Sequence, residues 1–309
     1  MDYDVIILGG GPGGISALLW CHSLGLRALL LEQAPELGGQ MLQMFHPVLE
    51  YPGFPNKTGA ELRDAFVAHL QEYQLTYRLN CQVEAIHLDT REVVIKGERI
   101  RAQALILATG ARNRSLGLPG ENTLVGQTIS YSATRDHQRF VGQEVCVVGG
   151  GDSAFEDCLI LAEVCPRVTL VHRSDQFRAR PNWQQAVFAH PRITVLAHSQ
   201  ITQIQPQEKT SLRLTIQDRQ TAMQQEFLVG GLFIRLGIAP NTEFLRGQIV
   251  LDTAGYIVAD RAQRTSVANI YAVGDVCHPV CLSVSTATGQ GAIAAKDIAE
   301  LLRCNTANH

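Results

Sequence analysis

The sequence predicts an α/β protein of two similar three-layer (ββα) domains, the second inserted into the first. Two observations predict the domains: an apolar strand runs into a glycine-rich turn at residues 5–14, and the same pattern returns at residues 145–154. A third predicts the insertion, because a strand and an apolar helix at residues 265–276 and 286–301 can complete the first domain. The predicted boundaries are 1–115 and 245–309 for the first domain, and 116–244 for the second.

The composition is that of a globular protein without a marked charge excess. The chain has 309 residues, 46% of them hydrophobic and 18% charged, which is enough for two packed cores. A formal net charge of −3 and the absence of basic runs argue against nucleic acid or an anionic membrane surface as a partner. The longest apolar runs have strand length and the chain opens on a strand, so we expect a cytoplasmic protein. Eight scattered cysteines predict no disulfide framework, and the histidines lack the spacing of metal ligands.

The first glycine turn, Gly9-x-Gly11-x-x-Gly14, has the surroundings of a Rossmann-like dinucleotide site. An apolar strand precedes it, an apolar helix follows, and the next strand ends at Glu32. Gly9 makes the tight turn, Gly11 lets the backbone approach a pyrophosphate, and Gly14 permits close packing of helix on strand. The helix N-terminus attracts phosphate, and a carboxylate at the strand end can accept hydrogen bonds from ribose hydroxyls. The predicted residues of this site are Gly9, Gly11, Pro12, Gly13, Gly14 and Glu32.

The second glycine turn lies in the same strand–turn–helix–strand pattern, but cations follow its second strand where the first pattern has an acid. Its second strand runs into His172 and Arg173, and Arg178 follows closely. Arginine can pair bidentately with phosphate oxygens, so cations in place of the acid favour NADP(H) over NAD(H). The alternative is a solvated basic face. The predicted residues of this site are Gly149, Gly151, Asp152, Ser153, Ala154, His172, Arg173 and Arg178.

Two nucleotide sites in one chain imply one bound cofactor and one that exchanges. Near the C-terminal end, a predicted strand runs into Gly274 and Asp275. A carboxylate at this strand end can lie against the ribitol or pyrophosphate of a flavin. We therefore expect FAD in the first domain and a pyridine nucleotide in the second.

Further motifs occur in an order that resembles the low-molecular-weight thioredoxin reductase family, class II of the pyridine nucleotide-disulfide oxidoreductases. The match runs over nearly the whole chain, and the set is far more specific than either glycine turn alone. Beside the two glycine turns, the matching motifs are Gly38-Gly39-Gln40, Tyr51-Pro52-Gly53-Phe54, Ala108-Thr109-Gly110-Ala111, Leu116-Gly117-Leu118-Pro119-Gly120-Glu121, and Gly274-Asp275-Val276 with Gly289-x-Gly291.

The resemblance implies an FAD domain built from both ends of the chain and an NADPH domain between them. It also implies a homodimer, and a rotation of one domain against the other during turnover. Further FAD contacts outside the first glycine turn follow from the same resemblance. These are Gly39, Gln40, Val83, Ala108, Thr109, Gly110, Gly274, Asp275, Ser283 and Val284.

One departure from the family removes its redox-active cysteines. Members that reduce thioredoxin carry Cys-Ala-Thr-Cys-Asp before the second nucleotide strand, whereas this sequence has Ser132-Ala133-Thr134-Arg135-Asp136. Thiol–disulfide exchange needs an attacking thiolate and a resolving thiol, so the ordinary thioredoxin reductase mechanism is excluded at this segment. Arg135 is a candidate catalytic residue, because a guanidinium can stabilise an anionic reduced flavin. Alternatively, Arg135 fills the vacated space and pairs with Asp136, a second candidate that resembles the family's acid.

A second departure lies at the C-terminal flavin loop, where the family usually has an aromatic residue followed by Arg-Gln-Ala. This sequence has Cys281-Leu282-Ser283-Val284 there, and Cys277 lies four residues before Cys281. Cysteines at this spacing can bridge across a turn, so one hypothesis is that Cys277 and Cys281 form a relocated redox pair. The alternative is two independent packing cysteines beside a cofactor.

A third departure is Ser174, which stands where the family commonly carries a second consecutive arginine. It leaves NADH, or another nucleotide such as a second flavin, open for the inserted domain.

Two functions of different classes are compatible with these residues. The first is an FAD-dependent oxidoreductase that takes electrons from NAD(P)H and passes them to an acceptor other than thioredoxin. Acceptors of this kind include a small iron–sulfur or flavin protein, a low-molecular-weight disulfide, a quinone and oxygen. The alternative is a redox-inert flavin- or nucleotide-binding module that acts as a sensor or regulator.

Overall fold

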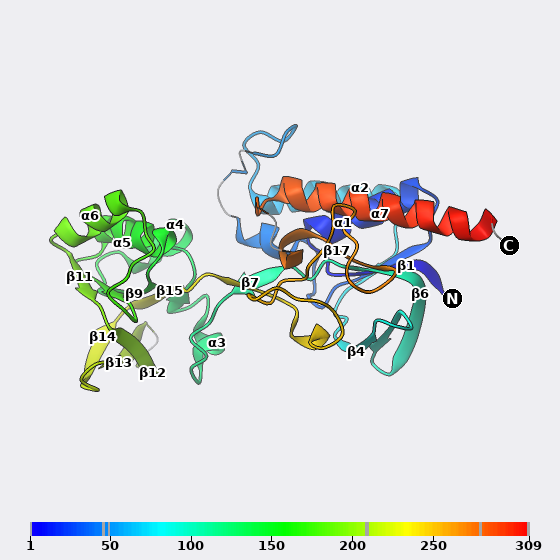
Figure 1. The fold of residues 1–309 in the computed structure, drawn as a ribbon. Coiled ribbons are helices and arrows are strands. Elements are labelled where there is room, and N and C mark those ends of the chain that lie inside the picture. The colour runs from blue at the N-terminus through cyan, green and yellow to red at the C-terminus, as the bar shows by residue number, and fades with distance from the viewer. Residues whose placement is uncertain (1, 45–46, 49, 208–209, 278–279, 308–309) are drawn as a thin grey trace. The chain divides into compact units, whose positions relative to one another are not determined.

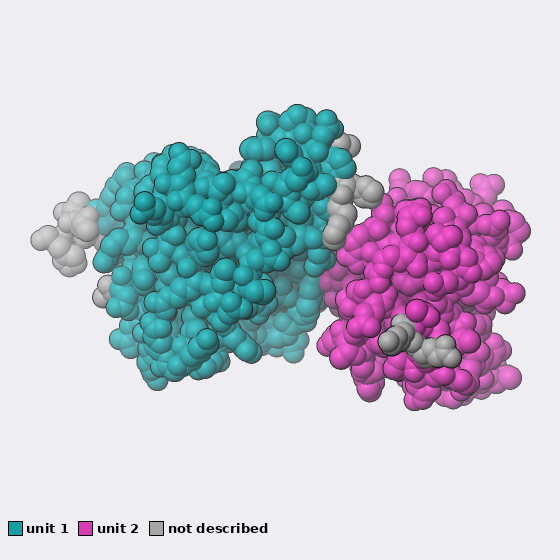
Figure 2. All heavy atoms as spheres, turned by 180° about the vertical axis from the view of Figure 1, so that it is seen from behind, with its two compact units in different colours: residues 1–112, 239–309 teal, residues 113–238 magenta. Residues whose placement is uncertain are grey.

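The computed structural model describes residues 2–44, 47–48, 50–207, 210–277 and 280–307. It contains two compact units, residues 1–112 with 239–309 (unit 1) and residues 113–238 (unit 2), which are coloured separately in Figure 2. Each unit has a largely parallel sheet with helices on one face and further β-structure, so the predicted α/β fold class is confirmed. The unit boundaries lie a few residues before the predicted positions 115 and 245.

Unit 1 is built on a seven-stranded sheet in the order β3-β2-β1-β6-β5-β4, with β17 also paired to β6. The parallel strands are β1 (Tyr3–Leu8), β2 (Ala28–Leu31), β3 (Tyr77–Arg78), the second half of β6 (Glu98–Leu107) and β17 (Ile270–Ala272). The antiparallel strands β4 (Val83–His87) and β5 (Glu92–Ile95) continue the sheet from the first half of β6. β1 and β2 contribute alternate residues to two buried clusters, one on each face of the sheet, which explains the apolar runs at residues 5–8 and 28–31.

Three helices cover one face of this sheet: α1 (Pro12–Ser23), α2 (Gly59–Glu72) and α7 (Val284–Ala307) (Figure 1). α1 and α7 lie side by side although they come from opposite ends of the chain, and both contribute to one buried cluster with the sheet. A Cβ atom at Gly291 would lie 2.4 Å from the Gly13 carbonyl oxygen and 2.9 Å from the Ala17 nitrogen. Only glycine therefore permits this helix contact, which joins the chain's two ends in one domain.

The C-terminal elements differ in length from the sequence-based expectation. The strand expected to run from residue 265 into Gly274 and Asp275 is only Ile270–Ala272. Asn269, with φ 62°, turns the chain just before it, and Gly274, with φ 76°, begins the short 3-10 helix η4 (Gly274–Cys277) after it. The helix expected over residues 286–301 is longer and runs over Val284–Ala307.

Unit 2 carries a five-stranded parallel sheet in the order β11-β10-β9-β15-β8. Its strands are β8 (Ile129–Ser130), β9 (Val145–Gly149), β10 (Val168–Val171), β11 (Ile193–Leu196) and β15 (Gly231–Arg235). Helices α5 (Asp152–Val164) and α6 (Pro181–Ala189) share one apolar cluster with the sheet. The antiparallel strands β12 (Ser199–Gln207), β13 (Ser211–Asp218) and β14 (Gln224–Val229) contribute to the cluster on its other face.

The remaining elements are short. Where the chain passes between the units, β7 (Ala111–Asn113) pairs with β16 (Ile238–Pro240). The others are η1 (Gly39–Gln43), α3 (Glu121–Leu124), α4 (Ala133–Asp136), η2 (His137–Phe140) and η3 (Glu243–Leu245). Over the part of the chain that the structure describes, every helix is too short or too polar to cross a membrane.

Candidate functional site

The glycine turn of unit 1 has the shape that its spacing predicts. Gly9 has φ 111°, and a Cβ atom there would lie 2.3 Å from the carbonyl oxygen of Ala108, which directly follows β6. A Cβ atom at Gly14 would lie 1.9 Å from the Gly9 carbonyl oxygen, so only glycine at position 14 lets α1 pack this close to the turn. Gly11 has no atom within 4 Å of its Cβ position, so the backbone is open to a ligand at the N-terminus of α1.

Glu32 holds this turn from the end of β2. Its carboxylate accepts hydrogen bonds from the amides of Gly10 at 2.5 Å and Ala34 at 2.8 Å. The Cys81 amide donates to the Glu32 carbonyl oxygen at 2.9 Å, and Val83 begins β4 two residues further on. The carboxylate therefore stands beside the glycine turn, where a ribose hydroxyl can reach it.

A contact between distant segments joins the C-terminal motif to the same edge of the sheet. The Gln40 side-chain amide donates to the Asp275 carboxylate at 2.6 Å across 235 positions of sequence. Burial raises the pKa of Asp275, and the hydrogen bond from Gln40 opposes that effect. Because β1, β2, β6 and β17 end in register, the segments that follow them gather at one carboxyl edge.

Other residues at this edge have structural partners of their own. Thr109 donates from its hydroxyl to the Asn241 carbonyl oxygen at 3.0 Å. Ser283 accepts from the Thr286 amide at 3.1 Å at the start of α7, and the Val284 side chain is buried in the core. Sequence analysis missed Gln290, whose side-chain oxygen accepts from the Gly274 amide at 2.7 Å. Its place between Gly289 and Gly291 was the available signal.

The glycine turn of unit 2 repeats this geometry. Gly149 has φ 157°, and a Cβ atom there would lie 2.5 Å from the Arg235 carbonyl oxygen, whereas Gly151 is open. Asp152, at the start of α5, accepts from the Arg180 amide at 2.7 Å and pairs with the Arg180 guanidinium at 2.8 Å. Ser153 is exposed in the first turn of α5, and the Ala154 side chain is buried beneath it.

The end of β10 carries the predicted cationic residues at the same edge. The His172 ring lies over Gly150, where a Cβ atom would be 2.3 Å from its Cε1, and it stacks on Phe177 at a centroid distance of 4.9 Å. Burial lowers the pKa of His172, and the charges of Arg173 and Arg178 lower it further. His172 therefore packs as a neutral ring at neutral pH, whereas both arginine side chains lie exposed beside the turn.

The segment at residues 132–136 forms a short capped helix, α4. The Ser132 hydroxyl accepts from the Arg135 amide at 3.3 Å. The Arg135 guanidinium and the Ser130 hydroxyl both donate to the Asp136 carboxylate at 2.6 Å. Burial acts to raise the pKa of Asp136, but Arg135, Ser130 and Arg139 outweigh it and the pKa is lowered. Asp136 is therefore a buried, paired carboxylate.

Asp157 anchors α4 from the neighbouring helix α5, a role that sequence analysis missed. Its carboxylate accepts from the Ala133 amide at 3.0 Å and lies 3.3 Å from the Arg235 guanidinium, which also donates to the Tyr131 carbonyl oxygen. Burial raises the pKa of Asp157 to about 6. The available signal was that Asp157 lies among the apolar positions on the buried side of α5, whereas the other acids of this helix do not.

Cys277 and Cys281 are both free thiols. Burial, together with the charge of Asp275, raises the pKa of Cys277 to about 12, whereas Cys281 is exposed. Residues 278–279, two of the three that separate them, lie outside the described residues. The redox pair remains a prediction, and in such a pair the exposed Cys281 would be the attacking thiol.

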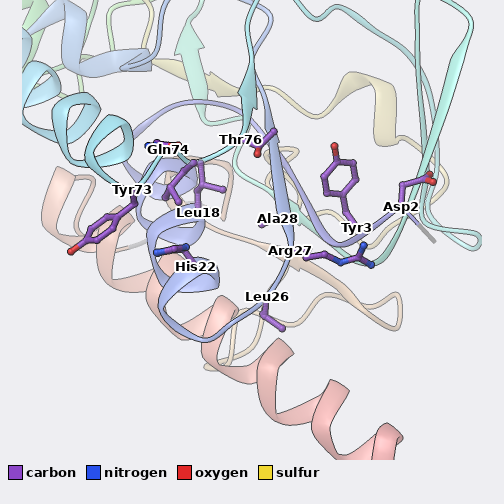
Figure 3. A pocket seen from close by; sticks show the side chains of 11 residues that line it. Asp2, Tyr3, Leu18, His22, Leu26, Arg27, Ala28, Tyr73, Gln74 and Thr76 are labelled. Atoms are coloured by element: carbon purple, nitrogen blue, oxygen red, sulfur yellow. The ribbon is translucent and has the colours of Figure 1, made fainter.

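A cavity of about 660 Å³ opens at the opposite, amino end of the unit 1 strands (Figure 3). Figure 3 shows Tyr3, His22, Arg27 and Tyr73 around it, at the start of β1, the end of α1, the start of β2 and the end of α2. None of the predicted site residues lines this cavity. It is therefore separate from the glycine turn at the carboxyl edge.

Comparison with known proteins identifies the class of this two-unit fold. The family model described as pyridine nucleotide-disulphide oxidoreductase matches residues 3–291. The chain therefore belongs to that family. Among curated relatives, the thioredoxin reductase of Mycolicibacterium smegmatis is 37% identical over 303 residues, covering 96% of this chain and 95% of that protein. The thioredoxin reductase of Bacillus subtilis is 34% identical, with 96% and 93% covered.

Solved structures agree with this assignment. The thioredoxin reductase of Lactococcus lactis, described as in the FR conformation, has a TM-score of 0.76 and 33% identity, covering 96% of this chain and 98% of that chain. That of T. acidophilum has a TM-score of 0.73 and 30% identity, with 97% and 98% covered. With relatives this similar over nearly its full length, the chain is an NAD(P)H-dependent flavin oxidoreductase that resembles thioredoxin reductase.

Proposed function

We propose that this chain transfers electrons from NADPH through FAD to an acceptor other than thioredoxin. The observation that carries the proposal is the residue pair at the family's cysteine positions, which here is Ser132 and Arg135. No two of the eight cysteines anywhere in the sequence have the Cys-x-x-Cys spacing. Neither serine nor arginine can form or resolve a mixed disulfide, so electrons must leave the flavin by another route.

FAD is proposed to bind at the glycine turn of unit 1. The residues fit a dinucleotide, because the backbone is open at Gly11 and the Glu32 carboxylate stands beside the turn. Gln40 and Asp275 form a polar pair at the same edge, suited to the hydroxyls of a ribitol chain. When bound, the flavin supplies the chemistry that accepts a hydride and releases electrons. The chain's own contribution is to bind and orient it.

NADPH is proposed to bind at the glycine turn of unit 2. Gly151 is open at the N-terminus of α5, and Arg173 and Arg178 are exposed cations beside the turn. Cations at the end of the second strand suit a 2′-phosphate better than a free ribose hydroxyl. The neutral ring of His172, the residue directly before Arg173, packs on Gly150 of the turn and on Phe177.

Among the candidate catalytic residues, Asp136 is proposed to be a permanent anion. Its lowered pKa and its pairing with Arg135 suit a charge that stays in place and argue against a group that gives up a proton at neutral pH. The same pairing favours the interpretation in which Arg135 fills the vacated space and pairs with Asp136, over the one in which it stabilises an anionic reduced flavin. Because α4 has no cysteine, the acceptor must take electrons without a thiol from this helix. A small redox protein, a quinone, oxygen or a low-molecular-weight disulfide could do so. As in related enzymes, a homodimer is expected.

The alternative is a flavin-binding sensor without turnover, which the loss of both cysteines favours. The second glycine turn argues against it, because a module that takes no hydride has no need for a cationic nucleotide site.

The test is an anaerobic titration of the purified holoprotein with NADPH, followed by the visible absorbance of the flavin. We expect the flavin band to bleach, and bleaching by NADH only at higher concentration. Reoxidation is then measured with thioredoxin, a low-molecular-weight disulfide, a quinone and a small iron–sulfur protein. A flavin that stays oxidised with both nucleotides would rule out the enzyme in favour of the sensor. Rapid reoxidation by oxidised thioredoxin would rule out the proposed acceptor class.

A further inference from the structure

A turn far along the sequence lies beside the end of β10 in unit 2. The amide of His172 donates to the Leu196 carbonyl oxygen at 3.0 Å, and the Ser199 amide donates back to the His172 carbonyl oxygen at 2.8 Å. Ser199 pairs in register with Asp218 across β12 and β13, and the Arg219 amide donates to the His198 carbonyl oxygen at 2.7 Å. The first residue of the β13–β14 turn is thereby fixed next to residues 172–174.

Arg219 extends its side chain onto that segment. Its guanidinium donates to the Arg173 carbonyl oxygen at 3.0 Å, across 46 positions of sequence. Arg173, Arg178 and Arg219 are all exposed, and within the described ranges none of them forms an ion pair with a carboxylate. The Arg219 guanidinium lies against the backbone of Arg173, and Arg178 follows in the same loop with its amide bonded to Gly150. By these backbone positions the three arginines form a patch at the carboxyl edge of β10, with donors left over for an anion.

Two carboxylates that neighbour this patch in sequence, Asp175 and Asp218, have other partners. Asp218 accepts from the amides of Gln220 and Thr221, each at 2.8 Å, and these bonds lower its pKa. Asp175 accepts from the Gln176 side chain at 3.4 Å and lies 3.8 Å from the His198 ring. Asp218 thus shapes the turn that presents Arg219, and neither acid neutralises the arginines.

Ser174 stands where the family commonly carries an arginine, so one cation of that pattern is missing from the loop. Its hydroxyl accepts from the Gln176 amide at 3.3 Å and bonds within its own loop, so it adds no charge to the patch. Arg173 and Arg178 can balance the two charges of a dianionic phosphate, and a third guanidinium would add hydrogen-bond donors for its remaining oxygen lone pairs.

We propose that Arg219 is a third ligand of the adenosine 2′-phosphate of NADPH, supplied by the antiparallel hairpin and acting with Arg173 and Arg178. The inference rests on the proposed function in one respect, which is that the nucleotide bound in unit 2 is NADPH. It adds a specificity-determining residue that lies outside the β-α-β unit of the glycine turn. The positive patch is thus assembled from two separate parts of the chain.

The experiment is calorimetric titration of the FAD-loaded protein with adenosine 2′,5′-bisphosphate and, in parallel, with adenosine 5′-monophosphate. The two probes differ only in the 2′-phosphate, and neither measurement needs turnover. The variants are R219M, R219K and R173M. The matched control is R192M, because Arg192 also donates to a backbone carbonyl oxygen at 3.0 Å, that of Ala162, but at the amino end of β11. A thermal melt of each variant checks its folding.

We expect R219M to weaken binding of the bisphosphate about tenfold, which corresponds to about 1.4 kcal/mol, and to leave the monophosphate unchanged. R219K retains part of the affinity, and R192M binds both probes as the wild type does. If R173M loses affinity and R219M does not, Arg219 is no ligand while the NADPH assignment stands. If R219M weakens both probes equally, Arg219 only supports residues 172–174 and the inference fails. If the wild type binds both probes equally, the NADPH assignment itself fails, and the inference with it.

Discussion

Replacing Gly291 by alanine is expected to destabilise unit 1 and to lower its FAD content, whereas the same change at Gly289 is not. Both glycines lie in α7, two residues apart, but Gly291 is buried and Gly289 is exposed. A Cβ atom at Gly291 would lie 2.4 Å from the Gly13 carbonyl oxygen, whereas one at Gly289 meets no atom within 4 Å. Gly13 belongs to the glycine turn, so a displaced α7 also disturbs the start of α1.

The magnitude follows from two opposing effects. Alanine is better than glycine in a helix by about 1 kcal/mol, so G289A should be slightly stabilising. G291A gains the same amount, but it must separate two helix backbones at a cost of about 3 kcal/mol or more. The net loss of about 2 kcal/mol corresponds to a fall in melting temperature of about 5 °C for a unit of this size.

Thermal unfolding and the absorbance ratio of flavin to protein measure both consequences in the two variants. G291A should melt below the wild type and retain less FAD, and G289A should match or exceed the wild type in both. A G291A protein as stable as G289A would show that α7 does not pack on α1 through this glycine.

Three further predictions concern charge and sulfur. The double variant R173M/R178M should raise KM for NADPH by about 100-fold, the product of two lost charge-assisted contacts, and leave KM for NADH nearly unchanged; equal increases would refute the 2′-phosphate assignment. C281S should abolish NADPH-dependent reduction of low-molecular-weight disulfides if the loop is catalytic, and unchanged turnover would make Cys281 a packing residue. D157N should alter the pH dependence of stability, because burial raises the pKa of Asp157 from 3.8 to about 6. As pH rises, the Asp157 carboxyl ionises in the unfolded chain before it does so in the folded protein. The free energy of unfolding of the wild type therefore falls by up to about 3 kcal/mol relative to that of D157N between about pH 4 and 6, and does not fall further above pH 6. Urea unfolding at several pH values measures this difference, and parallel curves would contradict it.

The parts of the site that sequence predicts best are those in which a few adjacent residues decide the geometry. Gly9, Gly14 and Gly149 are examples, because each is placed where a side chain would collide with backbone. The strand–turn–helix geometry around these glycines brings backbone atoms close to them, and the spacing of that motif can be recognised in the sequence. Both helices that follow the glycine turns could be placed for the same reason.

Contacts between distant segments could not be predicted in this way. Gln40 meets Asp275 across 235 positions, and Arg219 meets Arg173 across 46. Each pair depends on how whole strands are ordered in a sheet, and nothing in the local pattern marks the partner. The length of β17 was overestimated mainly because the sequence pattern does not reveal that Asn269, with φ 62°, turns the chain directly before Ile270.

The short helix at the family's cysteine positions is held by contacts that need no sulfur. Asp157 accepts from the Ala133 amide at 3.0 Å and is itself paired with Arg235. Ser132 caps the helix by accepting from the Arg135 amide, and serine is among the best residues for that role. Exchange of a thiol for a hydroxyl therefore removes the nucleophile without removing a structural contact. The frame of α4 is intact and only the thiol exchange chemistry is missing, which is compatible with the proposal that electrons leave the flavin for an acceptor other than thioredoxin.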